Sequence, residues 1–74
     1  MNLKIGRLFS PPERFTSLYL ITLDDHDIGA YYPEDNEIWI EDTSVKVTRE
    51  LRRALKALIQ ERFGIQHVPV KQID

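Results

Sequence analysis

The clearest set of metal-ligand side chains in the sequence is the run Asp24-Asp25-His26-Asp27. Carboxylate and imidazole groups coordinate divalent cations. A calcium loop, however, spaces its ligands at alternate positions and needs a glycine for its sharp bend, and this run has neither feature. Aspartates are also typical of tight turns. We therefore expect a solvent-exposed hairpin turn here, with no bound metal and no other cofactor.

No set of side chains in the sequence has the pattern of a catalytic site. The chain has no cysteine nucleophile, and Ser10, Ser17 and Ser44 lack the flanking glycines of a nucleophile elbow. The three glycines stand too far apart to form a phosphate-binding loop or a dinucleotide fingerprint. Because no residues combine in compatible catalytic roles, we predict that the protein is not an enzyme.

A group of basic residues is predicted to share one side of a helix. At 100° per residue they fall within an arc of roughly 100°, beside the helix's apolar arc. These residues are Arg49, Arg52, Arg53 and Lys56. Such a row of cations can follow a phosphate backbone. The net charge of the chain is −2, however, whereas a nucleic-acid module is usually basic overall. Nucleic-acid binding through this face, as a dimer, is therefore the alternative interpretation.

The acidic residues are concentrated in one segment, which also carries aromatic side chains. Residues 15–45 hold eight acids and no lysine or arginine, whereas residues 46–62 carry a net charge of +4. Tyrosine and tryptophan are favoured anchors of protein interfaces. The segment is therefore the preferred candidate for a protein-binding surface. The predicted binding residues are Tyr31, Tyr32, Glu34, Asp35, Glu37, Trp39 and Glu41.

The sequence allows two environments for Trp39. Strand alternation places it with Glu37 and Glu41 on one face and the two neighbouring isoleucines on the other. If the face that carries Trp39 is exposed to solvent, Trp39 is an accessible aromatic side chain with a carboxylate on either side. Such a surface would suit a basic protein that normally holds nucleic acid. If that face is covered, Trp39 lies over a second small core, and the alternation alone does not choose between the two.

The length of the chain limits how these residues can be positioned. Its 74 residues make one domain, spanning 1–74, whose core contributes only a few kcal/mol of net stability. Without cysteines, further stability must come from close packing or from oligomerisation, so a homodimer stays open. No apolar run reaches the length of a membrane span or a secretory signal. We therefore expect a cytoplasmic protein without membrane contact.

Five strands and one helix are predicted. The strands fall at residues 3–9, 16–23, 28–32, 37–41 and 67–73, with Pro69 placing the last one at a sheet edge. The helix has an apolar arc that includes Leu51, Leu55, Leu58 and Ile59. Its N-cap is either Ser44 or Thr48. Thr48 is favoured because the β-branched residues at 45–48 disfavour a first helical turn that starts after Ser44. Gly64 ends it as a left-handed residue.

These elements predict a small α+β domain. An antiparallel sheet, made of a meander with N- and C-terminal strands, is packed by one amphipathic helix at about 48–63. The preferred function is a non-enzymatic binding protein, a regulator or inhibitor that docks on a larger protein or nucleoprotein. An inhibitor encoded by a phage or mobile element is one example of this class.

Overall fold

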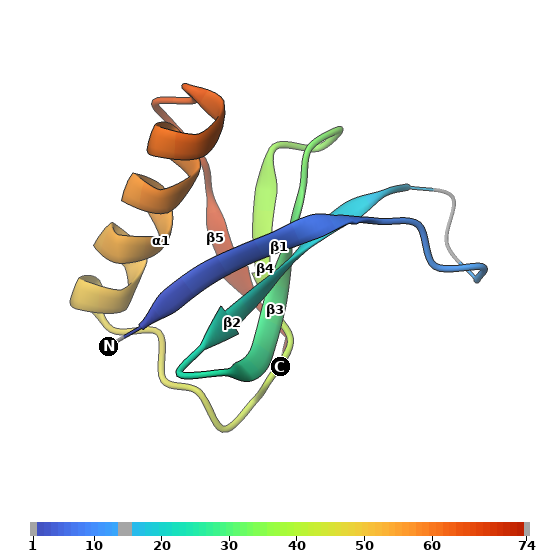
Figure 1. Ribbon diagram of the computed structural model, residues 1–74. Coiled ribbons are helices and arrows are strands. Elements are labelled where there is room, and N and C mark those ends of the chain that lie inside the picture. Colours follow the sequence, from blue (N-terminus) through green and yellow to red (C-terminus); the bar gives the residue numbers. More distant parts are fainter. Residues whose placement is uncertain (1, 14–15, 74) are drawn as a thin grey trace.

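The computed structural model describes residues 2–13 and 16–73, which form a five-stranded sheet with one helix on one face (Figure 1). The strand order is β1-β2-β3-β4-β5, the same as the order along the chain. The elements are β1 Leu3–Phe9, β2 Leu18–Leu23, β3 His26–Tyr32, β4 Glu37–Ile40, α1 Arg49–Phe63 and β5 Val70–Gln72. The predicted α+β class, with one helix packed on the sheet, is confirmed.

The sheet is mixed, because only its first three strand pairings are antiparallel. β4 pairs with β5 in parallel, with Ile38 opposite Val70 and Ile40 opposite Gln72. An entirely antiparallel sheet was expected, and the last pairing differs because α1 acts as the crossover between β4 and β5. A crossover helix carries the chain back to the end of the sheet at which β4 began, so the next strand runs parallel to β4.

The β2–β3 connection is the hairpin turn that the aspartates predicted. Asp24 and Asp25 have φ angles of 50° and 69°, so both central residues adopt the left-handed conformation. Two such residues are the signature of a type I′ turn, whose twist matches that of the flanking strands. The turn is shorter than expected, since β3 already begins at His26.

The ends of α1 follow the predicted capping residues. The Thr48 hydroxyl accepts a hydrogen bond from the amide of Leu51 at 3.1 Å, which confirms Thr48 rather than Ser44 as the N-cap. Gly64 has a φ of 71°, and its amide donates to the carbonyl of Gln60 at 2.8 Å. The helix therefore begins and ends where the sequence indicated.

The main core lies between α1 and the sheet. Leu51, Leu55 and Ile59 are buried at one-turn spacing against Ile21, Tyr31, Ile38 and Ile40. Leu58, which shares the apolar arc, is only partly buried, so Ile59 takes the last buried position. Phe63 closes the end of this core, with its ring centroid 4.9 Å from that of Tyr19 and 5.2 Å from that of Tyr31. Within residues 2–13 and 16–73, no helix is long and apolar enough to cross a membrane.

Candidate functional site

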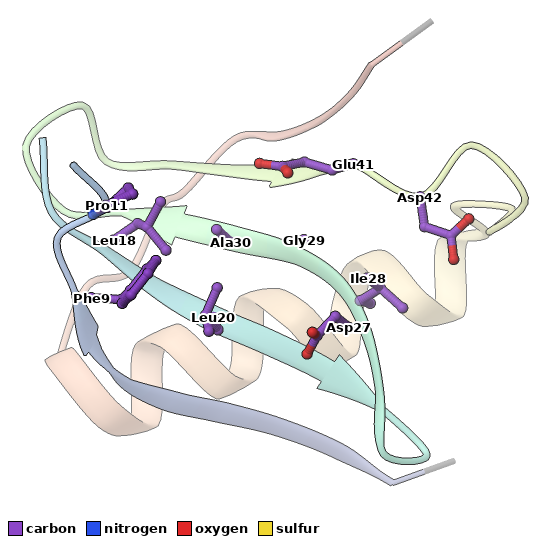
Figure 2. Close-up of a pocket in the computed structure, with 10 residues that line it drawn as sticks. All are labelled: Phe9, Pro11, Leu18, Leu20, Asp27, Ile28, Gly29, Ala30, Glu41 and Asp42. Carbon is purple, nitrogen blue, oxygen red and sulfur yellow. The ribbon is translucent and has the colours of Figure 1, made fainter. Parts of the chain in front are cut away.

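The candidate site is the face of the sheet that α1 does not cover, which we call the open face. Residues opposite each other in a ladder point to the same side of a sheet. Phe9 lies opposite Leu18, and Ala30 lies opposite both Leu20 and Trp39, which places all five on this side. Tyr32, Lys71 and Ile73 follow by strand alternation. Figure 2 shows several of these side chains gathered over β2 and β3.

A second, smaller core forms part of the open face. Leu18, Ala30 and Tyr32 are buried there, and Trp39 packs against them while remaining half-buried. Trp39 therefore points away from α1 and covers a small core, which is the second of the two environments that the sequence allowed. Its indole Nε1 donates a hydrogen bond to Glu37 Oε1 at 3.2 Å, and the Lys71 ammonium lies 5.5 Å from its ring centroid.

Two hollows lie side by side on the open face. The first has a volume of about 430 Å³ and the second a volume of about 250 Å³. The first is lined by Phe9, Pro11, Leu18, Leu20, Asp27, Ile28, Gly29, Ala30, Glu41 and Asp42 (Figure 2). The second is lined by Thr16, Tyr32, Asp35, Trp39, Glu41 and Ile73. Glu41, directly after β4, lines both hollows and so marks the boundary between them.

Large apolar side chains remain accessible around these hollows. Phe9 is 48% exposed, Leu20 39% and Ile73 44%. Leu8 is 54% exposed as well, but it lies opposite Tyr19 and so belongs to the side that faces α1. Exposed apolar side chains are common when scattered singly, whereas a group of them on one face is typical of an interaction site.

The charges on the open face are unevenly distributed. Glu37 forms an ion pair with Lys71, and hydrogen bonds from Lys71 and then from Trp39 hold the pKa of its carboxyl below the usual value. Among the described residues, neither hollow is lined by a lysine or arginine, whereas Asp27, Asp35, Glu41 and Asp42 line one or both. The described lining residues therefore combine apolar side chains with carboxylates.

Asp42 shapes the loop that follows the open face. Its Oδ1 accepts hydrogen bonds from the Ser44 hydroxyl at 2.6 Å and from the Ser44 amide at 2.9 Å. These bonds favour the ionised form and lower the carboxyl's pKa from its ordinary value of 3.8. The stability that they add is present above that ordinary value and is lost as the pH falls through the lower folded-state pKa.

An Asp42→Asn variant should therefore be less stable than the wild type at pH 7 and should approach it in strongly acidic solution. Asparagine keeps an oxygen acceptor for Ser44 but removes the charge. Urea unfolding of both proteins at pH 7 and below the ordinary Asp pKa of 3.8 measures the difference. An unchanged gap between them at both pH values would show that ionisation of Asp42 is not the cause.

The structure separates the predicted protein-binding residues into several places. Tyr32, Asp35, Trp39 and Glu41 come together around the second hollow. Tyr31 is fully buried on the side facing α1, where burial raises the pKa of its phenol and its hydroxyl donates to Asn36 Oδ1 at 3.0 Å. The other two residues are Glu34, exposed in the β3–β4 turn, and Glu37, paired with Lys71.

Sequence reasoning did not find the part of the open face contributed by β1, β2 and the C-terminal end. Phe9, Leu20 and Ile73 are absent from the predicted surface although they carry its exposed apolar area. The alternation in β2 does place Leu18 and Leu20 on one face, which was an available signal. The contributions of Phe9 and Ile73 depend on the β1–β2 register and on β5 joining β4, which no local pattern reveals.

The basic residues predicted for nucleic-acid binding lie on α1, on the other side of the sheet. Arg49, Arg52 and Arg53 are exposed, and Lys56 is half-buried. Arg52 Nη1 donates to the carbonyl of Val70 at 3.3 Å, so part of this charge is used to attach α1 to β5. The open face and the basic helix face are thus two distinct surfaces of the molecule (Figure 1).

The side chains of the Asp24–Asp27 run do not form a cluster that could hold a metal ion. In the described part of the chain, no three His, Asp or Glu side chains come together to hold a metal ion. Comparison of the chain with protein-family models, with curated proteins and with solved structures finds no match.

Proposed function

We propose that this protein is a small non-enzymatic binding protein, a regulator or inhibitor that docks on a larger protein or nucleoprotein through the open face of its sheet. The observation that carries the proposal is the combination of two hollows with exposed Phe9, Leu20 and Ile73 around them. Apolar area of this kind supplies most of the favourable free energy in protein association.

The charge of the open face indicates what kind of partner it fits. Carboxylates line both hollows, and complementary charge steers association and disfavours wrong partners. A basic protein surface is therefore the favoured partner, and a bare polyanion is disfavoured. The aromatic side chain of Trp39 at the edge of the second hollow adds a residue type that is enriched at binding hot spots.

The proposal can be tested by capture from a lysate of the native host, using the chain and two matched variants as bait. The open-face variant carries Leu20→Ser and Ile73→Ser, and the helix variant carries Arg49→Gln and Arg53→Gln. All four positions are exposed, so both variants should fold. A protein identified with the wild type should be retained by the helix variant and lost with the open-face variant. If that protein were lost with the helix variant and still captured by the open-face variant, the proposal would be contradicted.

The exposed arginines of α1 support a second candidate function, nucleic-acid binding by the helix. Titration of a labelled DNA duplex at two salt concentrations distinguishes it from the first. Three or four phosphate contacts would give a slope of about −3 in log K against log salt. Micromolar binding with that slope, lost on Arg49→Gln and Arg53→Gln, would favour this candidate, whereas we expect the wild type to bind the duplex weakly.

A further inference from the structure

We propose that the outer edge of β1 binds an acidic polypeptide segment in extended conformation, which joins the five-stranded sheet as a further strand. This edge is separate from the basic helix face, and its use goes beyond the proposed function because it gives the chain a second way of binding a partner. Three features of β1 support it. They are outward-facing backbone groups, apolar side chains exposed on both sides of the sheet, and basic residues that form no ion pair with a described acid.

The sheet has two edge strands, and the fold protects them to different extents. β5 has three residues, follows Pro69, and its Val70 carbonyl accepts a hydrogen bond from Arg52 Nη1 at 3.3 Å. Short length, proline and a covering side chain are usual means of protecting a sheet edge. β1 has seven residues and pairs only with β2 among the described elements. Its outer edge is therefore the longer and more accessible template for another strand.

The first half of β1 directs backbone hydrogen-bonding groups away from the sheet. The amide of Asp24 donates to the carbonyl of Asn2 at 2.8 Å, which fixes the pattern of the ladder at the start of β1. Because ladder hydrogen bonds alternate along an antiparallel pair, Lys4 also bonds to β2, whereas the amides and carbonyls of Leu3 and Ile5 point outward. Among the described residues, no hydrogen bond from another element reaches these outward groups. A strand laid against them would continue the ladder.

The exposed apolar side chains at the end of β1 lie on opposite sides of the sheet. Leu8, 54% exposed, lies opposite Tyr19 and belongs to the side that faces α1. Phe9, 48% exposed, lies opposite Leu18 and belongs to the open face. A partner that docks flat on the open face covers Phe9 and leaves Leu8 accessible. The side chains of an added strand alternate between the two faces, so one strand beside β1 covers both residues.

The charge of β1 favours an acidic occupant. β1 contains Lys4 and Arg7, both exposed, and no acidic residue. Within residues 2–13 and 16–73, the one ion pair is that of Glu37 with Lys71, so neither cation of β1 is paired with a described acid. Opposite charges on neighbouring strands attract each other, whereas like charges directly opposite are destabilising. Carboxylates on the added strand would therefore stabilise its pairing with β1.

The same features disfavour a second copy of β1 as the occupant. Pairing of two β1 strands would bring the basic side chains of both copies to one seam, where they repel. The register shift between Ile5 and Leu8 is a β-bulge, which limits the continuous ladder to the residues before it. Cations and a bulge are common protections of an edge strand against association with its own copies. An acidic segment paired with Leu3 and Ile5 fits this edge better than another copy of the chain.

Amide hydrogen exchange tests whether a segment joins β1 at this edge. The probe is a peptide of about ten residues made of valine and threonine with glutamates at both ends, and its control has lysine in place of each glutamate. We expect the glutamate peptide to slow exchange at the amides of Leu3 and Ile5 about tenfold when about nine-tenths of the protein is bound, because only the free protein exchanges there. The amide of Lys4, which already bonds to β2, is the internal control and should change little.

Two variants with the same change in net charge separate recognition at β1 from general attraction. Lys4→Gln with Arg7→Gln should weaken binding of the glutamate peptide about fivefold or more, because both cations of β1 are removed. Arg49→Gln with Arg53→Gln is the control on α1, and its affinity should stay within a factor of about two of the wild type. Leu8→Ser should also weaken binding of the peptide. Because Leu8 lies outside the open face, capture of a host protein by that face should persist in this variant.

Other outcomes would overturn the inference. No slowing of exchange at Leu3 and Ile5 with the glutamate peptide would show that no strand joins β1. Equal weakening by the β1 and helix substitutions would show a response to net charge alone, and equal protection by the lysine peptide would refute the preference for an acidic segment. Protection of the same amides on concentrating the protein alone would identify a second copy as the occupant. Each of these outcomes leaves the proposed function standing, because the Leu20 and Ile73 substitutions test the open face separately.

Discussion

Replacing Leu55 with alanine should remove most of the cooperative thermal transition of this protein. Leu55 is fully buried, at the middle of the three buried residues of α1. Truncating a buried leucine costs about 2–5 kcal/mol, because apolar contacts are lost and a cavity remains. A single core of this size rarely supplies more than about 3–5 kcal/mol, so the two quantities are comparable.

The same truncation on the open face provides the control for Leu55. Leu20→Ala removes the same atoms from a side chain that is 39% exposed, so its cost should be well below that of Leu55→Ala. Circular dichroism melts of the two variants beside the wild type give the comparison. If Leu55→Ala melted within a few degrees of the wild type, the packing of α1 on the sheet would not be the main source of stability.

The parts of the fold that sequence reasoning predicted correctly are those set by local chemistry. Thr48 caps α1 because its hydroxyl reaches an amide three residues later, and Gly64 ends it because a residue without Cβ tolerates a φ of 71°. The Asp24-Asp25 turn likewise follows from residues that accept positive φ angles. Each of these depends on neighbours within a few positions.

The parts that were not predicted depend on contacts between distant segments. The parallel pairing of β5 with β4 follows from the crossover through α1, which a short run of residues does not encode. The choice between burial and exposure for Tyr31 and Trp39 depends on which face of the sheet α1 covers. The sequence likewise predicted that the acidic segment forms a surface. It did not predict the second hollow, which Asp35 and Glu41 of that segment line together with the distant Ile73.

A Gly29→Ala substitution should be strongly destabilising, even though it adds only one methyl group. A Cβ at position 29 would lie 2.1 Å from the carbonyl oxygen of Trp39 and 2.9 Å from the Cα of Ile40. Both atoms belong to the β4 backbone, so no side-chain rotation can relieve the overlap. Overpacking of this kind costs about 1–3 kcal/mol and occasionally more, and we expect the upper end because β3 and β4 must separate. Gly29 also lines the first hollow, so the same movement would distort the open face.

Gly6→Ala is the matched control for Gly29→Ala, because it makes the same change in another strand of the same sheet. A Cβ there would meet the nearest atoms, the carbonyl oxygen and Cβ of Leu20, at 3.4 and 3.8 Å, which are ordinary contact distances. Replacing glycine with alanine where the backbone is compatible stabilises by about 0.4–1 kcal/mol, since the unfolded chain loses freedom. Urea midpoints at unchanged slope should therefore fall markedly for Gly29→Ala and stay level or rise slightly for Gly6→Ala. Equal losses of stability in both variants would show that the sheet does not tolerate an added methyl group at either glycine. The close approach of β3 to β4 would then not explain the glycine at position 29.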